Sequence, residues 1–419
     1  MLILRTILGL GFFCFVAWLL SSDRKRVPWR VIIWGLGLQF LLAALLLNTE
    51  WGRGLFEGMA GFVATLIGKA APGAELVFGP LADPAKMGAV FGPESGFVLA
   101  FAGTGLIAIV FFSALMAILY HLGIMQALVW LLARLLSAIM GVSGAEAMAM
   151  AANVFVGHTE APLVVRPYIS RMTLSELNAM MTGGFATIAG TVLAVYMGIL
   201  GEELGPHLIT ASVLSAPAAL LIAKLMRPET EVSETGRHVP FRIERTAANA
   251  LEAAANGTTT GVKLWLNIVA MLIAFVALVN LIDWPLGAAV EGLSLSKIFG
   301  WVFAPVAWAM GVEGWHDSQL MGSLLGIKVT LNELVALSEM QSYLPVGPEG
   351  EVFRSPRTAA MAAYALCGFA NFGSVGIQLG AIPTLAPERK ADVSRLAMRA
   401  MLGGAFASWM TATVAGLFL

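Results

Sequence analysis

Residues 141–165 read GVSGAEAMAMAANVFVGHTEAPLVV, and this stretch decides how the rest of the chain is interpreted. Its apolar part, Ser143 to Val165, is about as long as one crossing of a bilayer. However, Arg134 precedes it and Arg166 follows it, and basic residues mark loops on the same side of a membrane. The segment also contains a helix-breaking Pro162. We therefore expect a re-entrant hairpin that enters and leaves the membrane by one face.

The composition supports a membrane protein. Of 419 residues, 58% are hydrophobic and only 12% are charged, whereas soluble domains spend about a quarter of their residues on charge. The first apolar run is read as a retained helix, because its basic cluster follows it and no small-residue cleavage site lies nearby. The two cysteines lie in apolar segments and indicate neither a disulfide nor a metal site. No basic tract with interleaved aromatic residues is present, so nucleic acid is not an expected partner.

Lys and Arg residues predict an all-α polytopic protein of eight spans with both termini outside. The basic cluster Arg24–Arg30 places the first loop inside, and Arg354 and Arg357 are the exceptions to the pattern. The acidic stretch 50–94 is expected outside, with Leu55–Ile67 along the interface. The expected spans are Leu2–Leu20, Val31–Leu47, Phe97–Leu122, Leu177–Leu200, His207–Lys224, Leu264–Ile282, Ala359–Ile382 and Ala397–Leu419.

The hairpin belongs to an inverted internal repeat. A second segment, Glu313–Tyr343, is bracketed by acidic residues and is expected to form a second hairpin from the opposite face. The opening sequences match (GVSG at 141–144, GVEG at 311–314), and so do the cores of the following spans (GFATI at 184–188, GFANF at 368–372). Inverted repeats with interrupted apolar segments are typical of secondary transporters, whose sites lie near the membrane midplane.

Each hairpin carries a carboxylate at membrane depth, Glu160 in the first and Glu333 in the second. Ionisable residues are costly there, which makes both of them candidates for a functional site. For Glu333 a structural ion pair with Lys328 is the alternative.

Polar side chains near these carboxylates form two further groups. Asn153, the carbonyls freed at Gly157 and the Thr187 hydroxyl form an uncharged oxygen set that suits an alkali cation, although Asn and Thr also join membrane helices. His158 could respond to pH, bind a substrate edge or bond to a neighbour. In the seventh span, the amide of Asn371 and the hydroxyl of Ser374 are expected to face the cavity beside Glu333. Phe369 could stack on a flat ring of a substrate, or it could face lipid or the protein core.

At these residues the sequence resembles the concentrative nucleoside transporter family over nearly its whole length. The resemblance rests on FSALM with YHLGIM in the third span (112–116 and 120–125), 153–162 in the first hairpin, 183–192 in the next span, GIK with NE in the second hairpin (326–328 and 332–333), 251–267, and the positions of Phe369, Asn371 and Ser374.

The resemblance implies a homotrimer, with two hairpins and an elevator-like mobile domain in each protomer. It implies that His158, Thr159 and Glu160 bind the nucleobase, which Val192 also contacts. Glu333, Asn371 and Ser374 would hold the ribose hydroxyls, and Phe369 would line the pocket. Na⁺ would be bound by Asn153, the Val156 and Ile188 carbonyls and the Thr187 hydroxyl.

The chain departs from the family pattern at four of its positions. His158 stands where the family usually has Gln, which bears on base preference. Thr187 replaces a typical Ser and keeps the hydroxyl, while Leu334 and Leu337 replace aromatic residues. Proton coupling through Glu160 or His158 is therefore an alternative to Na⁺.

We expect import of nucleosides by Na⁺ symport across a bacterial-type inner (plasma) membrane, with lipid around the protein. The alternatives are H⁺ symport, a channel, and an intramembrane enzyme using Glu160 and His158; no metalloprotease motif or Ser–His pair favours the enzyme. The expected division is 1–122 (spans one to three with an interfacial helix), 123–226 (first repeat), 227–293 (cytoplasmic linker and span six) and 294–419 (inverted second repeat).

Overall fold

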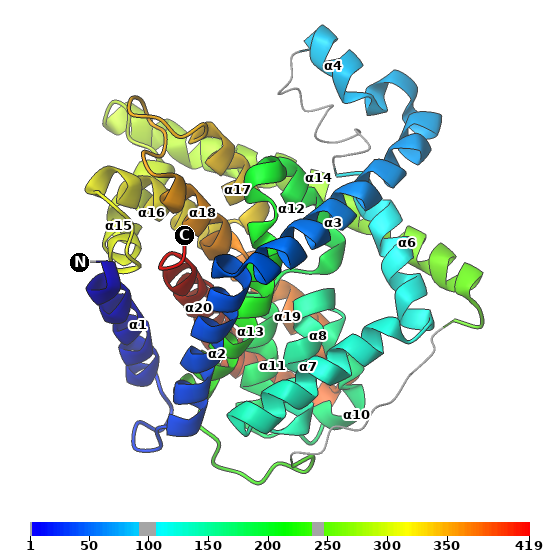
Figure 1. Ribbon diagram of the computed structural model, residues 1–419, viewed down its shortest axis with the longest axis vertical. Coiled ribbons are helices and arrows are strands. Elements are labelled where there is room, and N and C mark those ends of the chain that lie inside the picture. Colours follow the sequence, from blue (N-terminus) through cyan, green and yellow to red (C-terminus); the bar gives the residue numbers. More distant parts are fainter. Residues whose placement is uncertain (1, 92–105, 237–246) are drawn as a thin grey trace.

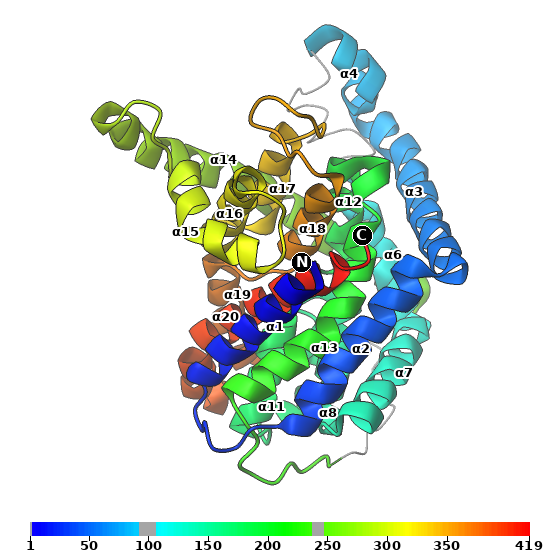
Figure 2. The ribbon, with the colours of Figure 1, turned by 60° about the vertical axis from the view of Figure 1, so that its left-hand side comes forward.

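The computed structural model describes residues 2–91, 106–236 and 247–419, and every regular element in these ranges is a helix (Figures 1 and 2). The first part of the chain forms α1 (Leu2–Leu19), α2 (Trp29–Asn48), α3 (Glu50–Phe78), η1 (Gly79–Ala82) and α4 (Pro84–Phe91). The middle forms α6 (Ala108–His121), α7 (Ile124–Met140), α8 (Gly144–Val156), α9 (Ala161–Val164), α10 (Arg166–Ile169), α11 (Leu174–Ala186), α12 (Gly190–Leu204) and α13 (His207–Met226). The remainder forms α14 (Ala250–Ala289), α15 (Leu295–Ala309), α16 (Trp315–Thr330), α17 (Glu333–Ser342), α18 (Pro356–Leu366), α19 (Phe372–Leu385), η2 (Pro387–Arg389) and α20 (Lys390–Ala415).

Several of these helices are long and apolar enough to cross a membrane. Four of the described helices qualify, or up to six if each of two bent helix pairs is one span. One of the four covers Gly61–Val90. The piece expected along the interface, Leu55–Ile67, is therefore part of a longer apolar helix. Part of the expected third span, residues 97–105, lies outside the described residues. The count of eight spans stays a prediction.

The fourth and seventh expected spans are each divided into two helices, which the sequence analysis did not predict. The fourth is interrupted between Ala186 and Gly190, and the seventh between Leu366 and Phe372. Both interruptions fall in or beside the repeated GFA sequence. At the second one, Gly368 adopts φ +107°, and the Asn371 side chain caps the next helix by accepting from the Ser374 N–H.

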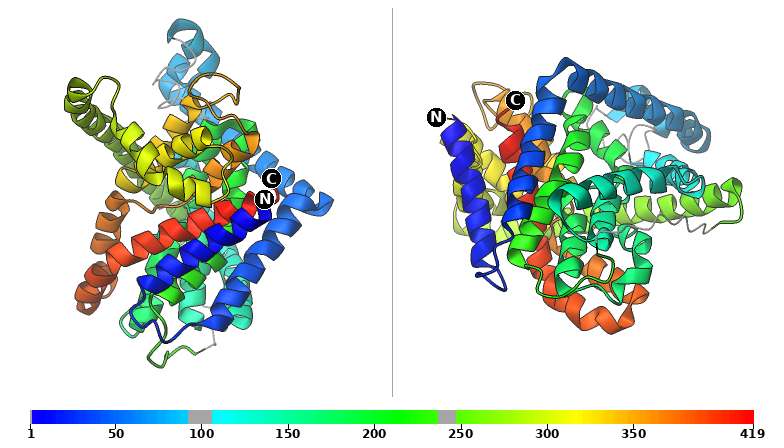
Figure 3. Two further views of the ribbon diagram at one scale, coloured as in Figure 1. Left: turned by 90° about the vertical axis from the view of Figure 1, so that its left-hand side faces the viewer. Right: turned by 60° about the horizontal axis from the view of Figure 1, so that its bottom comes forward.

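The two repeats pack around a buried centre. In α13, 94% of the most apolar 18-residue stretch is buried, and this helix packs against α2, α11 and α20 (Figure 3). By contrast, none of the most apolar 18-residue stretch of α14 is buried. An apolar surface of this kind is expected to contact lipid or another apolar surface. Figure 2 shows the N- and C-termini close to each other near the middle of the molecule, with the basic α1–α2 loop below them. The Ser22 N–H of that loop donates to the Met226 carbonyl at the end of α13 (3.0 Å).

The two interrupted spans meet backbone to backbone at Gly368. A Cβ atom there would lie 2.7 Å from the Phe185 carbonyl oxygen and 2.8 Å from the Ala186 carbonyl carbon. Strain and collision would then act together, so we expect Gly368→Ala to destabilise the fold by roughly 1–3 kcal/mol or more. The measurement is thermal unfolding of purified protein in detergent. Gly376→Ala is the matched control, because it lies in α19 with no atom within 4 Å. Equal melting temperatures for the two variants would contradict the close contact.

Candidate binding site

The first helix pair, α8 with α9–α10, ends against the break of the fourth expected span. Ser143 and Glu146 form a capping box that starts α8. The helix ends at Val156, and Gly157 follows with φ +83°. A Cβ atom on Gly157 would lie 2.6 Å from the Cβ of Ala189, so only glycine permits this approach. The residues expected around a cation, on α8 and near residue 188, are thereby brought together.

Asn153 and Thr187 leave oxygen lone pairs unused at this contact. The Asn153 amide donates to the Ala149 and Met180 carbonyls (2.9 and 3.2 Å), which is the helix-joining role; its Oδ1 is buried without a hydrogen-bond partner. The Thr187 hydroxyl donates to the carbonyls of Asn153 and Gly183 (2.8 and 3.0 Å). Its hydrogen is therefore committed and its lone pairs are available.

The same place supplies main-chain oxygens. The last carbonyls of α8 have no partner within the helix and lie at its negative end. Val156 and Ile188 are both buried. The described residues contain no cluster of three or more His, Cys, Asp or Glu that could hold a metal ion. Uncharged oxygens at a half-helix end fit a monovalent alkali cation better than a transition metal.

The second helix pair, α16 with α17, places Glu333 at the start of α17. The Glu333 carboxylate is buried and accepts from the Tyr196 hydroxyl (2.6 Å) and the Asn371 amide (2.9 Å). The Asn371 side-chain oxygen in turn accepts from the Ser374 N–H (2.7 Å). Glu333, Asn371 and Ser374 are therefore joined, as the sequence analysis expected.

Tyr196 was missed, although it lies one helical turn after Val192 and so on the same face of α12. That spacing was the available signal. The proposed ion pair between Lys328 and Glu333 is not formed. Instead the Lys328 ammonium donates to the Ala365 and Cys367 carbonyls and to the Ser408 hydroxyl.

His158 connects the two ends of the candidate site. Its ring lies 4.7 Å from that of Phe369, centroid to centroid, so the first helix pair touches the break of the seventh expected span. Val192 is buried, Glu160 is half-buried and Thr159 is exposed. Glu160 lines a cavity of about 400 Å³ between α8–α10 and the helices α6 and α14. That volume falls within the range of small-molecule pockets, roughly 300–1,000 Å³. Glu333, Asn371 and Ser374 do not line it.

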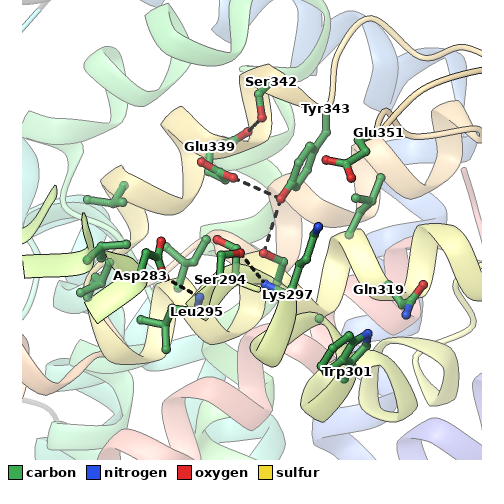
Figure 4. A pocket seen from close by; sticks show the side chains of 18 of the residues that line it. Asp283, Ser294, Leu295, Lys297, Trp301, Gln319, Glu339, Ser342, Tyr343 and Glu351 are labelled. Atoms are coloured by element: carbon green, nitrogen blue, oxygen red, sulfur yellow. Dashed lines mark hydrogen bonds between the residues drawn. The ribbon is translucent and has the colours of Figure 1, made fainter. Parts of the chain in front are cut away.

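A second cavity, of about 780 Å³, separates α17 from α14 (Figure 4). On one wall the Tyr343 hydroxyl donates to Glu339 (3.2 Å) and to Ser323 (3.4 Å). On the other, Asp283 accepts from the Leu295 N–H (2.6 Å). None of the hydrogen bonds drawn in Figure 4 joins α17 to α14. The second helix pair packs on α15, and α15 is bonded to α14 through Leu295 and Asp283.

Family models cover most of the chain. The model described as "Na+ dependent nucleoside transporter C-terminus" matches residues 207–416, and its N-terminal counterpart matches residues 8–81. A model described as "Nucleoside recognition" matches residues 105–203.

Known proteins are similar over the whole chain. The chain is 39% identical to nucleoside permease NupC of Helicobacter pylori, over 99% of this chain and 98% of that protein. It is 38% identical to human sodium/nucleoside cotransporter 1, over 97% of this chain and 63% of that protein. The structure is similar to that of CNTnw in an inward-facing substrate-bound state, with a TM-score of 0.93, 43% identity and coverage of 100% and 98%.

Proposed function

This chain belongs to the Na⁺-dependent, or concentrative, nucleoside transporter family, and on that premise we propose that it imports nucleosides by symport with Na⁺. It is a membrane nucleoside transporter and not an enzyme. We further propose the coupling ion, the residues that bind each ligand and the direction of transport.

The observation that carries the proposal is the Glu333 cluster. A buried carboxylate that accepts from Tyr196 and Asn371 retains lone pairs for the two adjacent hydroxyls of a ribose. Ser374 lies on the same side, one turn into α19. At the other end His158, Thr159, Glu160 and Val192 face the base, with Phe369 beside His158 as a surface for stacking. Hydrogen bonds to every polar group of the nucleoside avoid the free-energy cost of burying those groups without partners.

Na⁺ is proposed to lie between Asn153 Oδ1, the Thr187 hydroxyl and the carbonyls of Val156 and Ile188. The unpartnered buried Asn153 oxygen supports this position, because such an atom is costly unless something binds it. The bound ion would supply positive charge at the negative end of α8 and so hold α8 against residues 187–188. If protons drive transport instead, Glu160 and His158 are the groups that would carry them.

The transport cycle follows from which helices are bonded to which. We propose that both helix pairs are re-entrant, and that 123–226 and 294–419 move as one body past a static frame that contains α6 and α14. We assign α1 and α2 to the moving body, because Gln39 of α2 donates to the Leu214 carbonyl of α13 and to the Thr411 hydroxyl of α20 (3.3 and 3.1 Å). α14 packs chiefly against α6, which supports placing these two helices in one frame. The family also suggests a homotrimer, an inner (plasma) membrane location with surrounding lipid, and external termini. The exposed apolar surface of α14 is compatible with lipid or protein contact there.

The first test is uptake of radiolabelled uridine and adenosine into proteoliposomes under imposed Na⁺ or H⁺ gradients. We expect Na⁺-driven accumulation in the wild type. Glu333→Gln should raise the nucleoside KM about tenfold or more, because hydrogen bonds to a charged group contribute about 1.5–3 kcal/mol. Glu339→Gln is the control. Glu339 lies on the same helix but lines the cavity of about 780 Å³ between α17 and α14.

The ion site has its own matched pair in this assay. Thr187→Val should raise the half-saturating Na⁺ concentration about tenfold or more. Thr182→Val should change it little, since Thr182 lies within α11, before the break that carries Thr187, and is not one of the proposed ligands. Accumulation driven only by H⁺ would keep the substrate and discard the Na⁺ site. Absence of accumulation of either nucleoside under both gradients would refute the proposed function.

Substitution of Tyr196 is predicted to affect the return of the empty carrier more than the movement of the loaded carrier. With no nucleoside bound, the Tyr196 hydroxyl is one of two donors that compensate the buried Glu333 carboxylate. Ribose hydroxyls replace that compensation only when the carrier is loaded. Tyr196→Phe should therefore slow net uptake, which needs return of the empty carrier, by about tenfold. Nucleoside exchange, which does not need that step, should change much less. An equal loss in both assays would contradict this role.

A further inference from the structure

The side chain of Gln378 continues the polar face of α19. Asn371, Ser374 and Gln378 are spaced by three and four residues, so their side chains lie along one face of this helix and its cap. Asn371 and Ser374 lie at the Glu333 end of the candidate site. Gln378 lies one turn further along α19 and is only 1% exposed. The polar face therefore extends from the proposed ribose end into the interior of the protein.

Gln378 and His158 meet at a glycine of α11. A Cβ atom on Gly184 would lie 2.5 Å from the Cβ of His158 and 2.8 Å from the Nε2 of Gln378. Real Cβ atoms do not approach other atoms this closely, so only glycine lets both side chains lie here. Gly184 is inside α11, where glycine weakens a helix. The close contact of the first helix pair with α19 accounts for a glycine at this position.

Each of the two side chains has one polar atom without a partner. The Nε2 of Gln378 donates to the Met181 carbonyl (3.2 Å), which orients the amide and leaves its Oε1 free. Oε1 of Gln378 and Nδ1 of His158 are both buried, and neither has a hydrogen-bond partner in the part of the chain that the structure describes. Such atoms are uncommon in proteins, because each one costs free energy. An acceptor oxygen and a nitrogen that can carry hydrogen are the two halves of one hydrogen bond.

The shape of the imidazole decides which nitrogen faces Gln378. Nδ1 is the ring nitrogen nearer to Cβ, and the Cβ of His158 is the atom that lies against Gly184. Nδ1 therefore lies on the side of α11 and α19, and Nε2 lies at the outer end of the ring. The rings of Phe369 and Phe185 lie beside the imidazole, with centroids 4.7 and 6.5 Å away, and restrict its rotation. A hydrogen on Nδ1 of the neutral ring makes Nε2 an acceptor.

We propose that Gln378 is a specificity-determining residue that acts through His158. Oε1 of Gln378 accepts from the Nδ1–H of His158, so the Nε2 of His158 accepts from the nucleobase. This inference rests on the proposed function, because it concerns the base end of the same site. The ring N–H of uracil or hypoxanthine donates to Nε2, whereas cytosine and adenine have an acceptor nitrogen at that ring position. The preferred substrates are therefore nucleosides whose base has a ring N–H beside a carbonyl.

Uptake of two matched pairs of nucleosides into proteoliposomes is the first measurement. Uridine and cytidine differ at N3 and the exocyclic group beside it, and inosine and adenosine differ in the same way at N1. We expect the wild-type Vmax/KM to be about tenfold or more higher for uridine than for cytidine, and for inosine than for adenosine. Ratios near one would overturn this inference and leave nucleoside symport intact.

Substitution of Gln378 is the second measurement, and Gln39 supplies the matched control. Gln378→Met removes Oε1 at similar volume and leaves Nδ1 of His158 without its acceptor, so both ratios should fall about tenfold, toward one. Gln39 is also a buried glutamine that donates to a main-chain carbonyl and has an unpartnered Oε1 among the described residues, but it lies on α2. Gln39→Met should keep the wild-type ratios, whatever its effect on stability.

A double substitution separates specificity from a structural role. In His158→Gln an amide replaces the imidazole and can turn either its oxygen or its nitrogen to the base, so both ratios should fall toward one. Adding Gln378→Met to this variant should then lower the ratios no further, because the two residues act as one unit. If Gln378→Met instead reduces uptake equally for both members of each pair, with or without His158→Gln, its role is structural and the inference is overturned.

The outcomes also separate this inference from the proposed function. Uptake of all four nucleosides without discrimination would overturn the role of Gln378 and keep the transporter. Absence of uptake of all four under either gradient would refute the proposed function, and this inference with it. If Gln378→Met does not fold, His158→Gln alone decides, because unchanged wild-type ratios in that variant would overturn the inference.

Discussion

Main-chain groups released where a helix stops inside a membrane must find partners, because the surrounding lipid offers none. The structure satisfies this constraint with side chains at each break. The Asn332 and Asn371 side chains cap α17 and α19, the Thr187 hydroxyl bonds to the end of α8, and Lys328 bonds to the end of α18. The residues that satisfy broken backbone are also those that build the candidate site. Structure and proposed binding therefore draw on one set of side chains.

Much of this arrangement could be predicted, because its signals are local in sequence. The matched openings at 141–144 and 311–314 give the starts of α8 and α16, and the carboxylates Glu160 and Glu333 are conspicuous in apolar surroundings. The proximity of Glu333 to Asn371 followed from placing the seventh span beside the second hairpin, whereas the contact of His158 with Phe369 was not predicted. The family comparison then agreed with the reading made from the residues.

What could not be predicted depends on which helices meet in space. The breaks after Ala186 and Leu366 lie in apolar sequences that hydropathy alone treats as continuous spans. Lys328 seemed a neighbour for Glu333 because five residues separate them, but its side chain extends to α18 and α20 instead. Tyr196 lies 137 residues from Glu333, and no pattern along the chain links them. The cavity between α14 and α17 likewise arises only from their packing.

The contact at Gly368 has a thermodynamic consequence. The main chain at Phe185–Ala186 touches Gly368 with no side chain between them. Thr187 directly follows Ala186, and Asn371 lies three residues after Gly368. A shift at one broken span is therefore transmitted to its partner with little compliance. Linkage requires that whatever free energy an ion contributes to nucleoside affinity through this contact is returned equally to ion affinity by the nucleoside. Gly368 thus lies between the residues proposed to bind Na⁺ and the residues proposed to bind the nucleoside.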